Sequence, residues 1–116
     1  MIVGLIQCAK TKKSYPTIAA SMYWDSWAFR TGFKILKLRS DKIFIFSDKY
    51  GLIEPETMIS PYDVNPADLL EEELNILMLS ALEKLPADTH EVITIMPMRF
   101  VAKLEYLLPI NIKVTP

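Results

Sequence analysis

The chain has 116 residues, 51% of them hydrophobic and 23% charged, which fits one ordinary globular domain and excludes a disordered segment. No apolar run approaches the roughly 20 residues that a membrane-spanning helix needs. The single cysteine, Cys8, excludes an intramolecular disulfide and a zinc cluster. We therefore expect a cytoplasmic protein that forms one domain over residues 1–116, with no membrane partner, no metal and no cofactor.

The net charge of −1 hides an uneven distribution of charge along the chain. Residues 1–50 carry nine Lys/Arg and three Asp/Glu, whereas residues 51–116 carry four Lys/Arg and eleven Asp/Glu. This asymmetry predicts an anion-binding face assembled mainly from the first half. The alternative is that the two halves simply attract each other within the fold.

The first expected element is a buried strand over residues 2–7, followed by a loop with lysines at 10, 12 and 13. Basic loops at strand ends commonly hold phosphate, so Lys10 and Lys12 are predicted ligand contacts. The loop has no glycine and is therefore not a P-loop; a plain surface loop is the alternative. Cys8 has no nearby histidine, which favours a structural or ligand-lining role over a nucleophilic one.

Residues 18–38 have apolar side chains near helical spacing and are predicted to form one helix. Tyr23, near its start, is a predicted ligand contact. Trp24 and Trp27 lie near the predicted helix surface, where they could belong to the interface of a homodimer. Three aromatic residues of the helix are expected in the core: Trp27, Phe29 and Phe33.

The next strand, residues 43–46, runs directly into a polar turn that contains Ser47, Lys49, Tyr50 and Gly51. In open α/β sheets, ligands bind at the carboxyl ends of strands. A hydroxyl, a cation and an aromatic ring there, with Asp63 further along, suit a ligand that carries a phosphate and a base. Gly51 has a purely structural alternative, which is to supply a backbone conformation with positive φ.

The rest of the chain reads as a connecting segment (52–59), a helix that begins at Asn65-Pro66 and keeps an apolar face to about residue 85, a strand (91–96), a helix (98–108) and a short strand (110–114). This order predicts an α/β fold: a three-layer sandwich with a mostly parallel sheet of about four strands and helices on both faces. Arg99 is expected to face the same sheet edge as Lys10 and Lys49.

Two motifs together resemble a known family. They are Cys8-Ala9-Lys10-Thr11-Lys12-Lys13 after the first strand, and Phe46-Ser47-Asp48-Lys49-Tyr50-Gly51-Leu52 followed by Ile59-Ser60-Pro61-Tyr62-Asp63. This pattern is similar to small bacterial and phage domains of unknown function that resemble the YaaA peroxide-stress proteins. A related arrangement occurs in an accessory domain of archaeal tRNA-guanine modification enzymes. The resemblance covers residues 2–63 well and is weak beyond them.

The resemblance implies handling of nucleic acid or nucleobases. The positions that match its motifs are Cys8, Lys10, Lys12, Ser47, Lys49, Tyr50, Gly51, Pro61, Tyr62 and Asp63. The chain departs from the pattern after the third strand, where Met96-Pro97-Met98-Arg99-Phe100 replaces a segment with glycine and tyrosine in related domains. The far side of the expected pocket is therefore not defined by the resemblance.

Two functions follow as hypotheses. The first is a nucleic-acid- or nucleotide-binding domain, with action on a base or an N-glycosidic bond left open. Tyr50 or Tyr62 would stack on a base, and Lys49 and Asp63 are the candidate catalytic residues. Asp63 has an ordinary alternative as a turn residue. The second is a non-enzymatic protein-interaction module, such as a phage or plasmid inhibitor of a host factor, whose acidic residues 71–73 mimic nucleic acid.

Overall fold

The structure is a computed structural model that describes residues 1–63 and 70–116; the predicted helix start at Asn65-Pro66 lies outside these residues. Within the described residues, the main sheet has five strands in the order β4-β3-β1-β6-β7. β1 pairs in parallel with β3 and β6, β6 pairs in parallel with β7, and β4 is antiparallel to β3. The strands are β1 (Ile2–Gln7), β3 (Lys42–Ser47), β4 (Gly51–Ile53), β6 (Glu91–Ile95) and β7 (Lys113–Thr115). The α/β class is confirmed.

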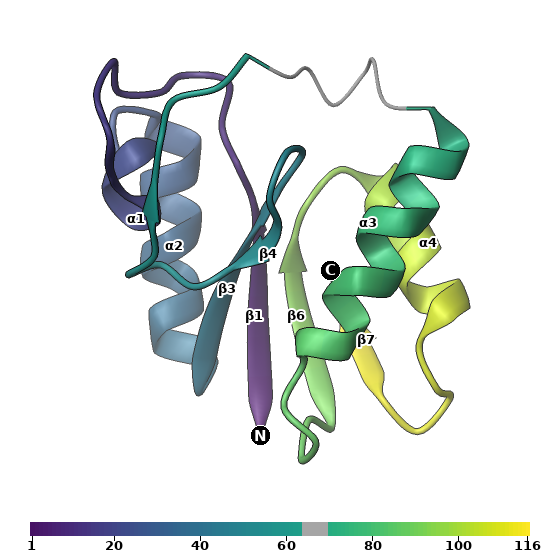
Figure 1. Ribbon diagram of the computed structural model, residues 1–116. Coiled ribbons are helices and arrows are strands. Elements are labelled where there is room, and N and C mark those ends of the chain that lie inside the picture. Colours follow the sequence, from purple (N-terminus) through teal and green to yellow (C-terminus); the bar gives the residue numbers. More distant parts are fainter. Residues whose placement is uncertain (64–69) are drawn as a thin grey trace.

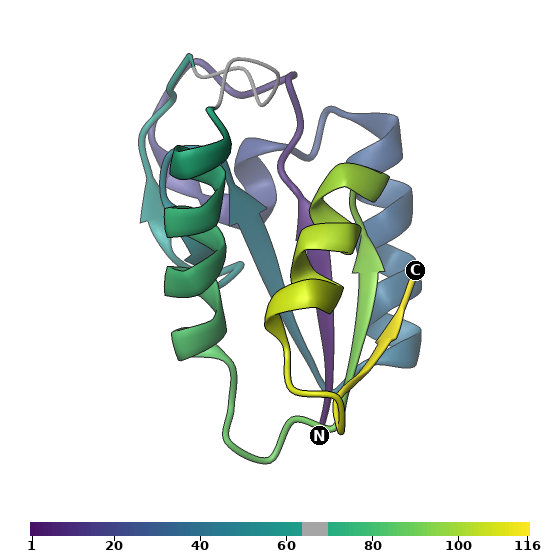
Figure 2. The ribbon, with the colours of Figure 1, turned by 90° about the vertical axis from the view of Figure 1, so that its right-hand side faces the viewer.

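Helices lie on both sides of this sheet (Figures 1 and 2). α2 (Trp27–Arg39) packs on one face, and α3 (Glu71–Lys84) and α4 (Met98–Leu107) pack on the other. The side chains of β1 alternate between the two cores, because successive residues of a strand point to opposite faces. Val3 and Leu5 join the α3–α4 side, and Ile6 joins the α2 side. No helix in these described stretches has the length and apolarity of a membrane span.

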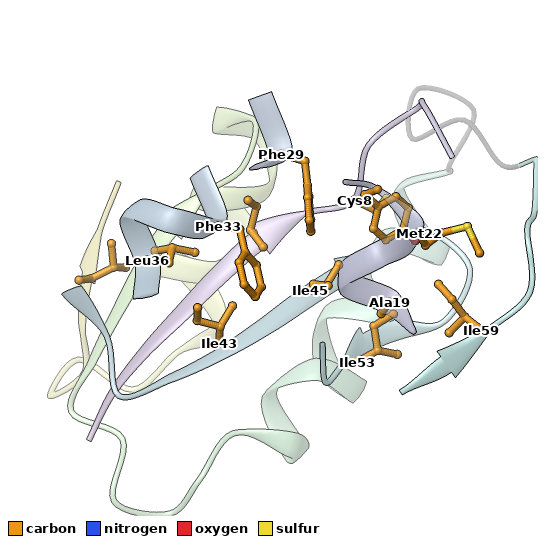
Figure 3. Packing of buried hydrophobic residues seen from close by; sticks show 13 residues of the cluster. Cys8, Ala19, Met22, Phe29, Phe33, Leu36, Ile43, Ile45, Ile53 and Ile59 are labelled. Atoms are coloured by element: carbon orange, nitrogen blue, oxygen red, sulfur yellow. The ribbon is translucent and has the colours of Figure 1, made fainter. Parts of the chain in front are cut away.

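A glycine in β1 lets α2 approach the sheet closely. A Cβ atom at Gly4 would lie 2.8 Å from Ser40 Oγ and 3.1 Å from Leu36 Cδ2, closer than real Cβ atoms normally come. The α2 side of the core is shown in Figure 3, where Phe29, Phe33 and Leu36 lie against Ile43 and Ile45 of β3. These contacts fix α2, and with it the position of its first turn at the carboxyl end of β1.

The single helix predicted over residues 18–38 is in fact two helices, α1 (Ala19–Met22) and α2. The break occurs because Ser26 has extended backbone angles and its Oγ accepts a hydrogen bond from Phe29 N at 3.3 Å, which starts a new helix. The predicted connecting segment 52–59 also contains strands. It supplies part of β4 and all of β5 (Met58–Ile59), which pairs with β2 (Thr17–Ile18) beside α1.

The aromatic residues of α2 divide between core and surface. Phe29 and Phe33 are buried, as predicted. The core prediction for Trp27 is wrong, because its side chain is 71% exposed. Since the helix begins at Trp27 rather than at residue 18, the face that packs on the sheet is defined by Phe29, Phe33 and Leu36, and Trp27 lies on the opposite side.

Candidate functional site

The lysine-rich loop and the later motif lie side by side at the carboxyl edge of the sheet. Cys8 N donates a hydrogen bond to Phe46 O at 3.0 Å, which extends the pairing of β1 with β3 into the loop. The ammonium of Lys12 lies 4.7 Å from the ring centroid of Tyr62. Two stretches that are about forty residues apart in the chain therefore share one surface, as the parallel topology predicts.

Ser47 is the hydrogen-bonding centre of the motif. Its Oγ donates to Tyr62 OH at 2.9 Å and accepts from the backbone N–H groups of Lys49 (3.2 Å) and Tyr50 (3.1 Å). Tyr62 OH is in turn hydrogen-bonded to Tyr23 OH. Gly51 closes the turn with φ of 72°, a conformation that glycine adopts without strain, so its structural interpretation is confirmed.

Both tyrosine hydroxyls of this network remain protonated. Burial is the main cause that raises the pKa of Tyr62 and of Tyr23 above the ordinary value of a phenol. Tyr23 is completely buried in this structure, and its contact with a ligand stays a prediction. Its role is to hold Tyr62, which joins the motif to α1.

A buried carboxyl group lies directly behind the lysine-rich loop. Asp48 is only 5% exposed; its Oδ1 accepts from Gln7 Nε2 at 2.8 Å, and its Oδ2 accepts from Cys8 Sγ at 3.5 Å. Burial raises the pKa of Asp48 more than the hydrogen bonds from Cys8 and Gln7 lower it. Burial, followed by the charge of Asp48, raises the pKa of the Cys8 thiol. A protonated, buried thiol is a poor nucleophile, so the geometry favours the lining role for Cys8.

Gln7 and Asp48 are the polar residues that the sequence reasoning missed. Each directly follows or ends a run of apolar strand residues, Gln7 after Val3-Gly4-Leu5-Ile6 and Asp48 after the strand that ends at Ser47. Polar side chains at the carboxyl ends of two neighbouring parallel strands are brought together by the strand register. Their position at the ends of two strands was the signal in the sequence that could have identified Gln7 and Asp48.

A pocket of about 400 Å³ opens at the carboxyl ends of β1 and β6, beside the first turn of α2. The connection from β1 leads to β3 on one side, and the connection from β6 leads to β7 on the other. Ligands in open α/β sheets bind at this kind of switch point. The lining residues are Ile6, Gln7, Cys8, Ala9, Lys10, Ser26, Ala28, Phe29, Ile95, Met96 and Pro97. Among these described residues, Lys10 is the one charged side chain.

Beside the pocket, two lysines flank a pair of tyrosine rings. The Lys12 ammonium lies over the Tyr62 ring, and the Lys49 ammonium lies 5.3 Å from the ring centroid of Tyr50. The rings of Tyr62 and Tyr50 pack edge to face, with their centroids 5.4 Å apart. Tyr50 OH donates to Ser60 O at 3.3 Å. Each contact of this kind contributes only about 0.5–1 kcal/mol at an exposed site, but together they hold two lysines on the same edge as Lys10.

Of the predicted site residues, only Cys8 and Lys10 line the pocket itself, and Asp63 and Arg99 also lie apart from the Ser47 network beside it. Asp63 is exposed beyond Tyr62. Arg99 is on the α3 side of the sheet, where its Nη2 lies 3.7 Å from Glu71 Oε2. Arg99 follows the carboxyl end of β6, but it does not line the pocket with Lys10, because the first turn of α4 directs it toward α3. Asp63 and Lys49 remain predictions as catalytic residues.

The fold and the site define a small α/β protein with a basic, partly apolar pocket at the carboxyl edge of its sheet. More particularly, the chain belongs to a family of unknown function, DUF6884, whose model matches residues 3–114. Comparison with curated proteins and with solved structures gave no match. The family description names no activity and no link to the YaaA proteins, so that resemblance remains a prediction.

Proposed function

We propose that this protein is a nucleotide- or nucleic-acid-binding domain whose pocket between the ends of β1 and β6 takes one nucleotide unit. The observation that carries the proposal is the pocket of about 400 Å³, with apolar walls, one lysine and no carboxylate among its described lining residues. Its volume falls within the roughly 300–1,000 Å³ range of small-molecule sites.

The chemistry of the lining supports an anionic ligand with a flat apolar part. Phe29 and Met96 offer apolar surface for a base, and the exposed Lys10 offers a cation for phosphate. Ser26 and Ala28 bring the first turn of α2, with its backbone N–H groups, to the same pocket. Helix N-termini and lysines are the groups that commonly bind phosphate.

The surroundings of the pocket support the same ligand class. Lys12 and Lys49 lie on the same edge. Of the carboxyl groups beside the loop, Asp48 is buried and has a raised pKa, and Asp25 is paired with Lys13 at 2.8 Å. An anion approaching this edge therefore meets mainly positive charge. The YaaA-like motifs in residues 8–13 and 46–63 are consistent with nucleobase handling, although several of their residues also have the structural roles described above.

Binding is better supported than bond cleavage. Hydrolysis of an N-glycosidic bond calls for a carboxylate that stabilises the developing positive charge or orients water. The described lining residues include no carboxylate, and Asp48 lies behind Gln7 and Cys8 with its oxygens occupied by them. We therefore propose a binding domain.

The test is isothermal titration of the protein with nucleoside monophosphates, comparing Lys10→Ala with Lys49→Ala. Both lysines are exposed and follow a strand, so the two variants are matched in charge and exposure. We expect Lys10→Ala to weaken binding roughly tenfold, the size of one lost charge-assisted contact, and Lys49→Ala to have a smaller effect.

Three results would contradict the proposal. If no nucleotide binds to the protein, the proposal is wrong. A large effect of Lys49→Ala with none of Lys10→Ala would move the site to the motif turn. Equal effects that parallel a fall in melting temperature would indicate loss of structure instead of loss of a contact.

A further inference from the structure

The outward face of α2 carries large apolar side chains that no described residue covers. Trp27 is 71% exposed and Leu38 is 88% exposed, and Ile35 beside them is 44% exposed. Residues 27, 34 and 38 lie on one face of the helix because their spacing of seven and four residues is close to whole turns. An exposed tryptophan at the start of a well-packed helix is a ready contact surface for another molecule.

The same helix carries only positive charge. From Ser26 to Ser40 the side chains include Arg30, Lys34, Lys37 and Arg39 and no Asp or Glu. Arg30 is engaged with Trp24 O at 2.8 Å, and Lys37 lies near the Phe33 ring, whereas Lys34 is exposed between Trp27 and Leu38. Antiparallel pairing with a second copy of α2 would bring like charges together. Charge complementarity therefore selects an anionic partner.

This face begins at the end of α2 that reaches the pocket. Ser26 and Ala28 both line the pocket, and Trp27 lies between them in the chain, with its side chain exposed. α2 begins at the end of the molecule where β1 and β6 finish, and then runs along the sheet toward the opposite end (Figure 1). Its 13 residues correspond to about 20 Å of helix, so the basic face extends well beyond the space of one nucleotide.

We infer that the ligand is a single-stranded nucleic acid that continues from the pocket onto α2. One nucleotide occupies the pocket, a neighbouring base stacks on Trp27, and the backbone phosphates pass Lys34. The inference rests on the proposed function and extends it from a nucleotide to a polymer. Aromatic side chains beside lysines and arginines are the usual means by which proteins bind single strands without reading sequence.

The experiment is fluorescence anisotropy with a labelled oligothymidylate of about twelve nucleotides, which is within the usual site sizes of about 4–16 nucleotides. Trp27→Ala should weaken binding roughly tenfold, as expected for loss of one base–aromatic stack, and Trp27→Phe should restore much of the affinity. Tyr106→Ala is the matched control, because Tyr106 is an aromatic residue with 86% exposure on α4, across the sheet. Its affinity should be unchanged.

Salt dependence provides a second reading of the same complex. Binding to a charged backbone falls steeply as salt rises, and each lost phosphate contact reduces the slope of log K against log salt by about one. Lys34→Gln should therefore weaken binding at low salt and flatten this slope. Because both side chains are exposed, Trp27→Ala and Lys34→Gln should leave the melting temperature unchanged.

Thymidine monophosphate and lipid vesicles separate the remaining outcomes. Loss of oligonucleotide binding in Trp27→Ala with unchanged binding of the monophosphate would support the inference. Equal affinity for monophosphate and oligonucleotide, or equal behaviour of Trp27→Ala and Tyr106→Ala, would overturn it and leave the pocket proposal standing. Trp27-dependent binding to vesicles of anionic lipid without binding of the oligonucleotide would also overturn it. If Lys10→Ala binds the monophosphate as well as the unmodified protein does, the pocket proposal itself fails.

Discussion

Replacing Tyr62 by phenylalanine tests whether the motif is held by its buried hydroxyl network. The change removes one oxygen atom and leaves the ring, so its packing against Tyr50 and the contact with Lys12 are retained. It removes the acceptor that Ser47 Oγ reaches at 2.9 Å and the partner of the Tyr23 hydroxyl. Ser47 Oγ keeps the two hydrogen bonds that it accepts from the backbone N–H groups of Lys49 and Tyr50.

The loss of stability in Tyr62→Phe depends on the Tyr23 hydroxyl, which is left without its hydrogen-bond partner. Tyr23 is completely buried, and a buried polar group that loses its hydrogen bond costs about 1–3 kcal/mol. The lower end applies if the Tyr23 hydroxyl turns to Ser47 Oγ, which belongs to the same network through Tyr62. For a chain of this length, each kcal/mol corresponds to roughly 4 °C in melting temperature.

The assay is guanidinium unfolding followed by far-UV circular dichroism for Tyr62→Phe, Tyr23→Phe and the double variant. Tyr23→Phe should cost less, because Tyr62 still accepts from Ser47. The double variant should cost about 1 kcal/mol less than the sum of the two, because it leaves no unpaired tyrosine hydroxyl. Tyr50→Phe, which loses only the exposed bond to Ser60 O, is the control and should change stability by less than about 0.5 kcal/mol. Additive effects of the two changes, or no effect of Tyr62→Phe, would refute the claim that this hydrogen-bond network stabilises the fold.

Two further predictions concern the same edge of the sheet. Asp48→Asn should become more stable relative to the unmodified protein as pH rises from about 4, the usual pKa of aspartate. Burial raises the pKa of Asp48 in the folded state, so ionisation of this carboxyl favours the unfolded chain above that pH. Urea unfolding of both proteins from pH 4 to 7 measures the difference in stability. A variant that loses stability relative to the unmodified protein as pH rises would show that the pKa of Asp48 is lowered. Gly51→Ala should cost about 1–2 kcal/mol, because φ of 72° is unfavourable for residues with a Cβ atom. The added Cβ atom itself would have room, since it would lie 3.8 Å from Leu77 Cδ2. Gly51→Asn should cost less in the same unfolding assay, and equal losses would indicate a steric cause.

The regular elements could be predicted wherever burial follows a simple local pattern. The strands at residues 2–7, 43–46 and 91–96 are runs of apolar residues, and the structure has β1, β3 and β6 there. Where the local pattern was ambiguous, prediction was less accurate. Residues 18–38 have helical spacing throughout, yet Ser26 caps a second helix, and residues 51–53 form an edge strand in a segment expected to be a connection.

The candidate site was predicted in part. Cys8 and Lys10 line the pocket, and Ser47, Tyr50 and Tyr62 lie together beside it. Tyr23 was predicted to contact a ligand because it lies near a helix start, but its side chain is buried and its hydroxyl is bonded to that of Tyr62. The role of Asp48 depends on the parallel register of β1 and β3, and no property of residues 47–52 alone reveals that Gln7 and Cys8 are its partners.

The sequence by itself determined the α/β class, the order of most elements and the gathering of polar residues after the strands, because each depends on hydrophobic patterns within short segments. Only the tertiary structure decided which side chains face water. Trp27 is exposed and Tyr23 is buried although both belong to the same apolar segment, since exposure depends on which face of α1 or α2 meets the sheet. That orientation results from the packing of Gly4, Phe29, Phe33 and Leu36, which brings together residues far apart in the chain.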